Sequence, residues 1–115
     1  MGGLAGNVVL VSIVLDGIAM QMDDYVIETL MRDLVGHDRR PASFLVYLWL
    51  TSEQARRRGG VEVSYQEMAE SIGISKSAAQ AAVGWLRRRK LVGVEKASAT
   101  AVPVYAVKTP WRRGR

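Results

Sequence analysis

The chain has 115 residues, of which 49% are hydrophobic, and it contains one histidine and no cysteine. Its length suits a single domain, and the lack of cysteine excludes a disulfide scaffold and a thiolate metal site. Residues 1–55 hold three Lys or Arg against seven Asp or Glu, whereas residues 56–115 hold thirteen Lys or Arg against four Glu. The basic half predicts a face that binds a polyanion, although a solvated surface explains the same charges.

The first apolar run extends from Leu4 to Leu15 and is too short to span a bilayer. No basic residue precedes it, so a secretory signal is not expected, and the chain is predicted to be cytoplasmic and to have no membrane contact. The part from Val8 to Leu15 is rich in β-branched residues and predicts a buried strand. Such a strand needs cover, either from the domain itself or from a second copy of the chain.

Two helices are predicted next. Asp23 suits the N-cap of a helix over residues 23–35, and Gly36 suits its C-terminal stop. A second helix is predicted over residues 41–58. Its segment Phe44–Leu50 is apolar without interruption, so we expect it to be buried on more than one side.

The most informative segment predicts two short helices joined by a tight turn, which is the spacing of a helix-turn-helix. Ser64, with Glu67 three residues later, forms a capping box for the first helix. Gly73 allows the turn, and Ser75 suits the N-cap of the second helix. This second helix is predicted to extend over residues 76–90.

Short strands flank this pair of helices. One is predicted at residues 61–63, and two more, at residues 91–96 and 102–107, form a hairpin after the second helix. Pro103 predicts an edge position for the last strand because proline cannot donate to a ladder. We expect a frayed basic tail over residues 109–115, in which the tryptophan can fold back.

In this order of elements the chain resembles the winged helix-turn-helix DNA-binding domains of bacterial transcription regulators, over residues 41–108. The resemblance implies a mainly α fold with a small β-hairpin wing (α+β), preceded by an extension of strand and helix over residues 1–40. Gly84 and Trp85 depart from the family, whose members often carry larger polar or basic residues there. The matching features are the alanine four residues before the turn glycine, the Ser-Lys-Ser opening of the second helix and the Leu-x-x-x-x-Leu-Val run into the wing: Ala69, Ser75, Lys76, Ser77, Leu86, Leu91 and Val92.

The second helix is therefore predicted to be a recognition helix that binds double-stranded DNA. Gln80 can pair with adenine, Lys76 can reach a phosphate or guanine, and Ala81 can touch a thymine methyl group. Ser75 and the free backbone N–H groups after it can hold a phosphate. A capped, solvated helix face explains the same residues without DNA. The predicted DNA-binding residues are Ser75, Lys76, Ser77, Gln80, Ala81, Arg87, Arg88 and Lys96.

Four cations at residues 87–90 exceed what the helix dipole needs, so we expect at least one to reach a phosphate. The arginines at residues 56–58 are weaker candidates, since they also suit a helix end. Lys96 is the predicted DNA contact from the wing. The alternative role of the wing is to close the core. Trp85 is predicted to stack on Arg89, to serve an interface or to pack in the core.

No acid, base and nucleophile stand at a recognisable spacing, so the chain is not expected to be an enzyme, and no cofactor or metal is predicted. The histidine, His37, is expected to be solvent-exposed in a polar connection over residues 37–40. No small-molecule effector can be named. The apolar surface of residues 4–50 predicts a homodimer built by the N-terminal strand and the two following helices.

Two alternatives to a small transcriptional regulator remain open. One is a plasmid or phage replication or partition factor that binds DNA through a similar winged domain. The other is a winged-helix module for protein–protein interaction, whose working surface would be the acidic, apolar N-terminal half. The arginine clusters beside the helix-turn-helix favour DNA.

Overall fold

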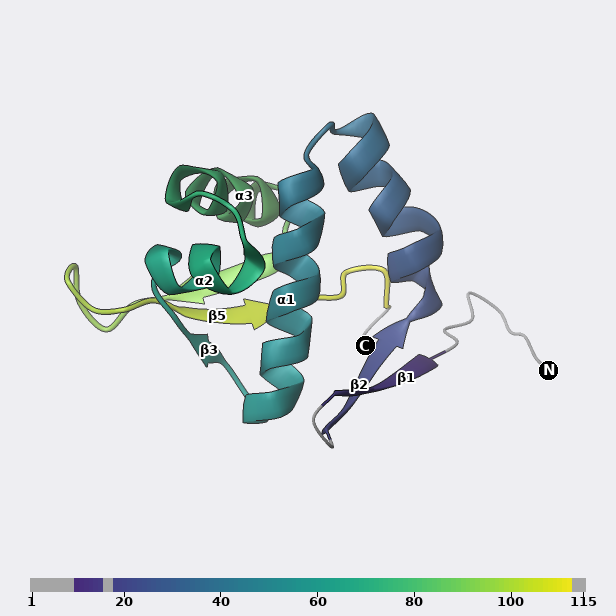
Figure 1. The fold of residues 1–115 in the computed structure, drawn as a ribbon, viewed down its shortest axis with the longest axis horizontal. Coiled ribbons are helices and arrows are strands. Elements are labelled where there is room, and N and C mark those ends of the chain that lie inside the picture. The colour runs from purple at the N-terminus through teal and green to yellow at the C-terminus, as the bar shows by residue number, and fades with distance from the viewer. Residues whose placement is uncertain (1–9, 16–17, 113–115) are drawn as a thin grey trace.

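The computed structural model describes residues 10–15 and 18–112, with side chains from residue 22 onward. Helix α1 (Pro41–Arg57) runs through the middle of the molecule (Figure 1). A pair of short helices and a three-stranded antiparallel sheet lie on one side of it, and the segment that precedes it in sequence lies on the other. The fold is therefore α+β and mainly helical, as predicted.

The described part of the chain begins with an antiparallel hairpin of β1 (Leu10–Leu15) and β2 (Ile18–Asp23), in which Leu10 lies opposite Asp23. The predicted strand is confirmed over the residues of β1, whereas Val8 and Val9 lie outside the described residues. The backbone partner of β1 is β2 of the same chain, a strand that was not predicted. Strand β2 lies against α1, which connects the hairpin to the rest of the fold.

The predicted helix after the hairpin exists but is wound differently. It comprises two π-helical segments, η1 (Val26–Leu30) and η2 (Arg32–His37), with hydrogen bonds between residues five apart, such as Asp38 N to Asp33 O at 2.7 Å. Gly36 lies inside η2, so its prediction as the helix stop is wrong. Every fourth residue faces the core: Val26, Leu30 and Leu34 are buried.

Helix α1 is buried on several sides, as its apolar run predicts, because it contacts β2, η2, α3 and the three-stranded sheet. Phe44, Val46, Tyr47 and Leu50 are buried in the core, whereas Leu45 is exposed. Pro41 occupies the first turn, where a missing N–H costs nothing. The helix ends one residue earlier than predicted.

The C-terminal half contains β3 (Val61–Glu62), α2 (Tyr65–Ile72), α3 (Lys76–Arg88), β4 (Val92–Glu95) and β5 (Val104–Val107). All five were predicted, with boundaries that differ by one or two residues at most ends. The sheet order is β3-β5-β4, and both pairings are antiparallel. Helix α3 packs against α1, α2 and β4.

Pro103 does not mark an edge strand, because β5, which follows it, is the central strand of the sheet. The proline stands just before the strand begins, so no ladder hydrogen bond is lost. Its carbonyl accepts a hydrogen bond from the N–H of Val63 at 3.2 Å. A proline that precedes a strand is compatible with a central position.

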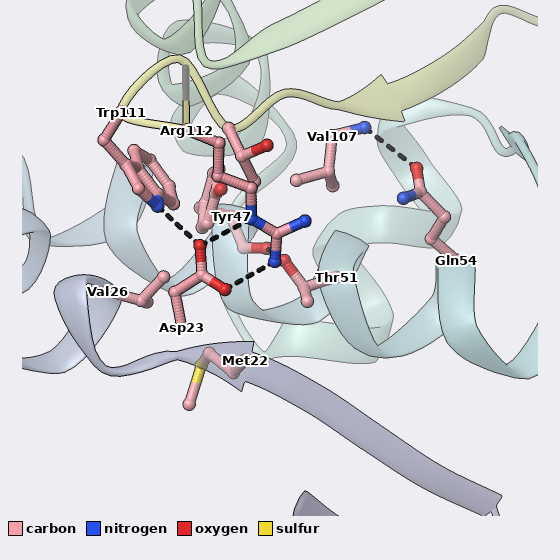
Figure 2. Close-up of a pocket in the computed structure, with 10 residues that line it drawn as sticks. Met22, Asp23, Val26, Tyr47, Thr51, Gln54, Val107, Trp111 and Arg112 are labelled. Carbon is pink, nitrogen blue, oxygen red and sulfur yellow. Dashed lines mark hydrogen bonds and ion pairs between the residues drawn. The ribbon is translucent and has the colours of Figure 1, made fainter. Parts of the chain in front are cut away.

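The predicted N-cap role of Asp23 is also wrong. Asp23 is the last residue of β2, and its buried carboxylate accepts hydrogen bonds from Trp111 Nε1 at 2.6 Å and from the guanidinium of Arg112 (Figure 2). Trp111 also stacks on Tyr25, with ring centroids 4.6 Å apart. The tail is thus folded back as far as Arg112, and residues 113–115 lie outside the described residues.

The ion pair changes the titration of Asp23. The hydrogen bond from Arg112 lowers the pKa of this carboxyl group, burial acts in the opposite direction, and the hydrogen bond from Trp111 and the charge of Arg112 complete a net lowering of the pKa. Burial raises the pKa of the neighbouring Tyr47 phenol, whose hydroxyl donates to the carbonyl of Lys108 at 3.0 Å. The tail is therefore attached to α1 as well as to β2.

Candidate nucleic-acid interface

The turn between α2 and α3 is built by the local signals that the sequence carries. Ser64 Oγ accepts from the N–H of Glu67 at 3.1 Å, and the Glu67 carboxylate accepts from the N–H of Ser64 at 3.0 Å, which completes the capping box. Gly73 takes a left-handed conformation with φ of 91°, which a glycine adopts without strain. Ser75 Oγ accepts from the N–H of Ala78 at 3.0 Å and so caps α3.

Helix α3 has one buried side and one exposed side. Ala79, Ala82, Val83 and Leu86 are buried against the core. No acidic residue occurs between Lys76 and Arg88. The opposite side, here called the outward face of α3, consists of exposed residues: Lys76, Ser77, Gln80, Ala81, Gly84, Arg87 and Arg88.

Six of the eight predicted DNA-binding residues thus lie together on the outward face of α3. Ser75 is exposed just before it, but its hydroxyl is engaged as the cap and lies 3.2 Å from Ser77 Oγ. The two serine hydroxyls are thus held at the start of α3 by the cap and by each other.

Lys96, from the loop after β4, lines a surface hollow of about 290 Å³ together with Lys76, the N-cap Ser64 and Tyr65 at the start of α2. Its Nζ donates to the carbonyl of Ala99 at 3.1 Å, which folds the loop on itself. The structure therefore places cations from the helix and from the hairpin on one hollow.

The cluster of four cations at the end of α3 divides into two groups. Arg87, Arg88 and Lys90 are exposed, whereas Arg89 is half-buried and its Nη1 lies 2.6 Å from the carboxylate of Asp38. Arg89 is thus neutralised within the chain. At the end of α1, the arginines at 56 and 57 pair with Glu53, which explains that second cluster as helix-end chemistry.

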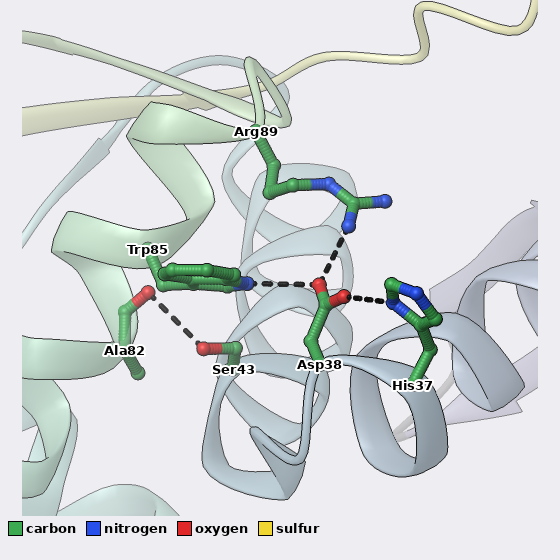
Figure 3. Close-up of polar contacts among 6 residues, drawn as sticks. All are labelled: His37, Asp38, Ser43, Ala82, Trp85 and Arg89. Carbon is green, nitrogen blue, oxygen red and sulfur yellow. Dashed lines mark hydrogen bonds and ion pairs between the residues drawn. The ribbon is translucent and has the colours of Figure 1, made fainter.

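Asp38 is an organising residue that was not predicted. It was expected only as part of a short polar connection, and just 3% of its side chain is exposed. Its carboxylate accepts from Trp85 Nε1 at 2.9 Å and from Arg89, and it bonds His37 Nδ1 at 2.8 Å (Figure 3). Ser43, in the first turn of α1, donates from its hydroxyl to the carbonyl of Ala82 at 3.4 Å.

Burial alone would raise the pKa of Asp38, but the hydrogen bonds from His37 and Trp85 and the charge of Arg89 outweigh it and lower the pKa. His37 itself is exposed, as predicted, although it belongs to the end of η2. The carboxylate ties the segment before α1 to the C-terminal part of α3.

Trp85 does not stack on Arg89 as one of its predicted roles required. The guanidinium carbons over its ring belong to Arg40, at 4.4 Å from the ring centroid, and to Arg88, at 5.4 Å. The ring is partly buried against the core. No local pattern marks this arrangement, because Arg40 and Asp38 are distant from Trp85 in sequence.

No protein-family model, curated protein or solved structure matches this chain. Within residues 10–15 and 18–112, no group of three or more His, Cys, Asp or Glu side chains is placed to hold a metal ion. In the same part of the chain, no helix has both the length and the apolar character needed to cross a membrane. The geometry of α3 and its surroundings is therefore the basis for a functional proposal.

Proposed function

We propose that this chain is a sequence-specific double-stranded DNA-binding protein, a small transcriptional regulator of the winged helix-turn-helix type, with α3 as the recognition helix. The observation that carries the proposal is the outward face of α3, which is exposed, free of acidic residues and basic at both ends. A duplex is a polyanion whose major groove admits one α-helix. This face offers the charge and the hydrogen-bonding groups that such a groove requires.

The order of elements supports the same reading. From residue 41 onward, a helix, a short strand, two helices and a β-hairpin follow one another, and the short strand β3 pairs with β5 of the hairpin. This arrangement is typical of a winged helix, in which β4 and β5 form the wing. The hollow that Lys96 and Lys76 both line then supports contacts of wing and helix with neighbouring parts of one duplex.

On this proposal the individual roles follow from chemistry. Gln80 offers a side-chain amide that matches adenine, and Lys76 offers a cation for a phosphate or for guanine. Ser77 and the backbone around Ser75 hold a phosphate at the start of α3, where the helix dipole favours negative charge. Arg87 and Arg88 contact the DNA backbone at the C-terminal end of α3.

A homodimer is part of the proposal. The side of the η1–η2 stretch that faces away from the core exposes Ile27, Met31 and Val35, which recur at every fourth residue with 38–42% exposure. A row of this kind suits burial against a second copy. Sedimentation at tens of micromolar should give twice the monomer mass, and a monomer would overturn this part alone.

The same exposed row is the observation that favours the alternative of a protein-interaction module. The two functions differ in their response to salt. Binding to DNA should weaken steeply as salt rises, with a log–log slope near −0.9 for each phosphate contacted. A protein partner held by the apolar row should show a much smaller salt dependence.

The test of the proposed function is selection of bound duplexes from a random DNA pool by the purified chain. The proposal predicts enrichment of one motif, with two related half-sites if the protein binds as a dimer. A replication or partition factor would give the same enrichment. The position of the motif in the genome then distinguishes such a factor from a transcriptional regulator. No enrichment, together with no salt-dependent binding to any duplex, would overturn DNA binding.

A further inference from the structure

Trp85 lies at the meeting point of two segments that are far apart in sequence. Its indole N–H is fixed by Asp38 at 2.9 Å, and the same carboxylate neutralises Arg89. The ring therefore has a defined position at the C-terminal part of α3. A partly buried indole with its single donor satisfied offers its π face to cations.

Two arginines lie over this indole ring. The Cζ atoms of Arg40 and Arg88 lie 4.4 Å and 5.4 Å from the ring centroid, so both guanidinium groups are held against one indole ring. Both side chains are exposed, and no carboxylate pairs with either within the described part of the chain. A stacked guanidinium keeps its in-plane N–H donors available for a bidentate phosphate contact.

The backbone before α1 is built to hold Arg40 there. Its N–H donates to the carbonyl of Leu34 at 2.7 Å, and the following proline disfavours a helical conformation at this residue, which has φ of −129° and ψ of 65°. The residue is thus fixed between η2 and the start of α1. A side chain that is ordered beforehand loses less entropy when it binds.

We propose that Arg40 and Arg88, held over Trp85, form a clamp for the DNA backbone phosphates beside the C-terminal end of α3. The inference rests on the proposed function and extends it, because it assigns a DNA contact to a residue outside the helix pair and its wing. It also gives a role to Trp85, one of the two positions that depart from the family pattern. Arg88 alone was predicted from the sequence.

The experiment measures binding of a fluorescein-labelled mixed-sequence duplex of about 25 base pairs over a series of salt concentrations. The variants are Arg40→Gln and Arg88→Gln, with Arg32→Gln as the control that carries the same charge change. Arg32 is exposed on η2, outside α3 and the wing. Each clamp variant should reduce the slope of log affinity against log salt by about 0.9 and weaken binding about fivefold, whereas the control should not change either value.

Arg40→Lys keeps the charge but not the planar stacked group, so its salt slope should equal that of the wild type while its affinity is lower. If the wild-type protein binds and Arg40→Gln has the same slope and affinity, the clamp is refuted and the proposed function stands. If the wild-type protein binds no duplex at low salt, the proposed function itself fails. Thermal unfolding of every variant verifies that the exposed substitutions leave the fold intact.

Discussion

Two aspartates in the N-terminal half with buried side chains each accept hydrogen bonds from one indole and one guanidinium group, but they connect different segments. Asp23 accepts hydrogen bonds from the indole of Trp111 and the guanidinium of Arg112, and Asp38 accepts them from Trp85 and Arg89. The first site, here called the tail clasp, ties the C-terminal tail to β2. The second, here called the helix clasp, ties the segment before α1 to α3.

The difference lies in the charge that each site leaves at the surface. In the tail clasp the indole stacks on Tyr25. In the helix clasp the indole instead carries the exposed side chains of Arg40 and Arg88. Similar anchoring chemistry can therefore close a fold at one place and present cations at another, depending on what covers the aromatic ring.

The largest expected effect is on stability at the tail clasp. Asp23→Ala removes a buried acceptor that receives a charged and a neutral donor, and we expect the free energy of unfolding to fall by about 3 kcal/mol. Urea unfolding measures it. Asp24→Ala is the control, because it removes only a charge near a helix start and should cost less than about 1 kcal/mol. Equal effects of the two substitutions would contradict the role of the clasp.

The helix clasp should respond in two ways. Asp38→Asn should lower the free energy of unfolding by about 2 kcal/mol, because the amide cannot replace the charged acceptor for Arg89. It should also weaken DNA binding severalfold, since loss of the ion pair with Arg89 loosens the helix clasp that positions Trp85. In fluorescence anisotropy with a labelled duplex, Asp23→Ala should bind as the wild type does. Loss of affinity in Asp23→Ala, or none in Asp38→Asn, would remove the distinction between the two clasps.

Acid should weaken both clasps, by less than the substitutions do. The folded pKa of each aspartate is lowered, so its stabilising contribution is present above the unfolded pKa of about 3.9 and is lost as pH falls through the folded pKa. The free energy of unfolding should therefore decrease between about pH 5 and pH 3. Asp23→Asn and Asp38→Asn should each make this decrease smaller. If the free energy of unfolding of a variant depends on pH as that of the wild type does, the carboxylate is not stabilising.

The smallest effect concerns the outward face beside the helix clasp. A Cβ built at Gly84 meets no atom within 4 Å, so Gly84→Ala should raise the free energy of unfolding by up to about 1 kcal/mol. If a duplex approaches α3 closely there, Gly84→Leu should weaken DNA binding while the protein remains at least as stable as the wild type. Unchanged affinity in Gly84→Leu would place the duplex away from this turn of the helix.

The elements that the sequence predicts well are those with local signals. Ser64 with Glu67, Gly73 and Ser75 act within three or four residues, and the structure confirms each of them. Strand β2 carries no comparable signal, since two of its six residues are methionines and its pairing depends on the preceding strand. The π-helical winding before α1 is likewise not encoded in hydrophobic spacing.

The two clasps could not be predicted because their partners are far apart in sequence. Asp23 lies 88 residues from Trp111, and Asp38 lies 47 residues from Trp85. An aspartate before a helix is locally indistinguishable from an N-cap, which is why the N-cap interpretation of Asp23 was wrong. In contrast, exposure of the outward face of α3 follows from helical periodicity, so the candidate DNA-binding residues were found together.

The central claim is that the outward face of α3 reads DNA, and one measurement tests it most directly. The affinity for the duplex selected from the random pool is compared between the wild type and Lys76→Ala/Gln80→Ala, with Arg32→Ala on η2 as a surface control. The proposal predicts binding at least about tenfold weaker for the double variant, from the lost base and phosphate contacts, and no change for the control. Equal affinity and equal salt dependence of the double variant and the wild type would contradict it.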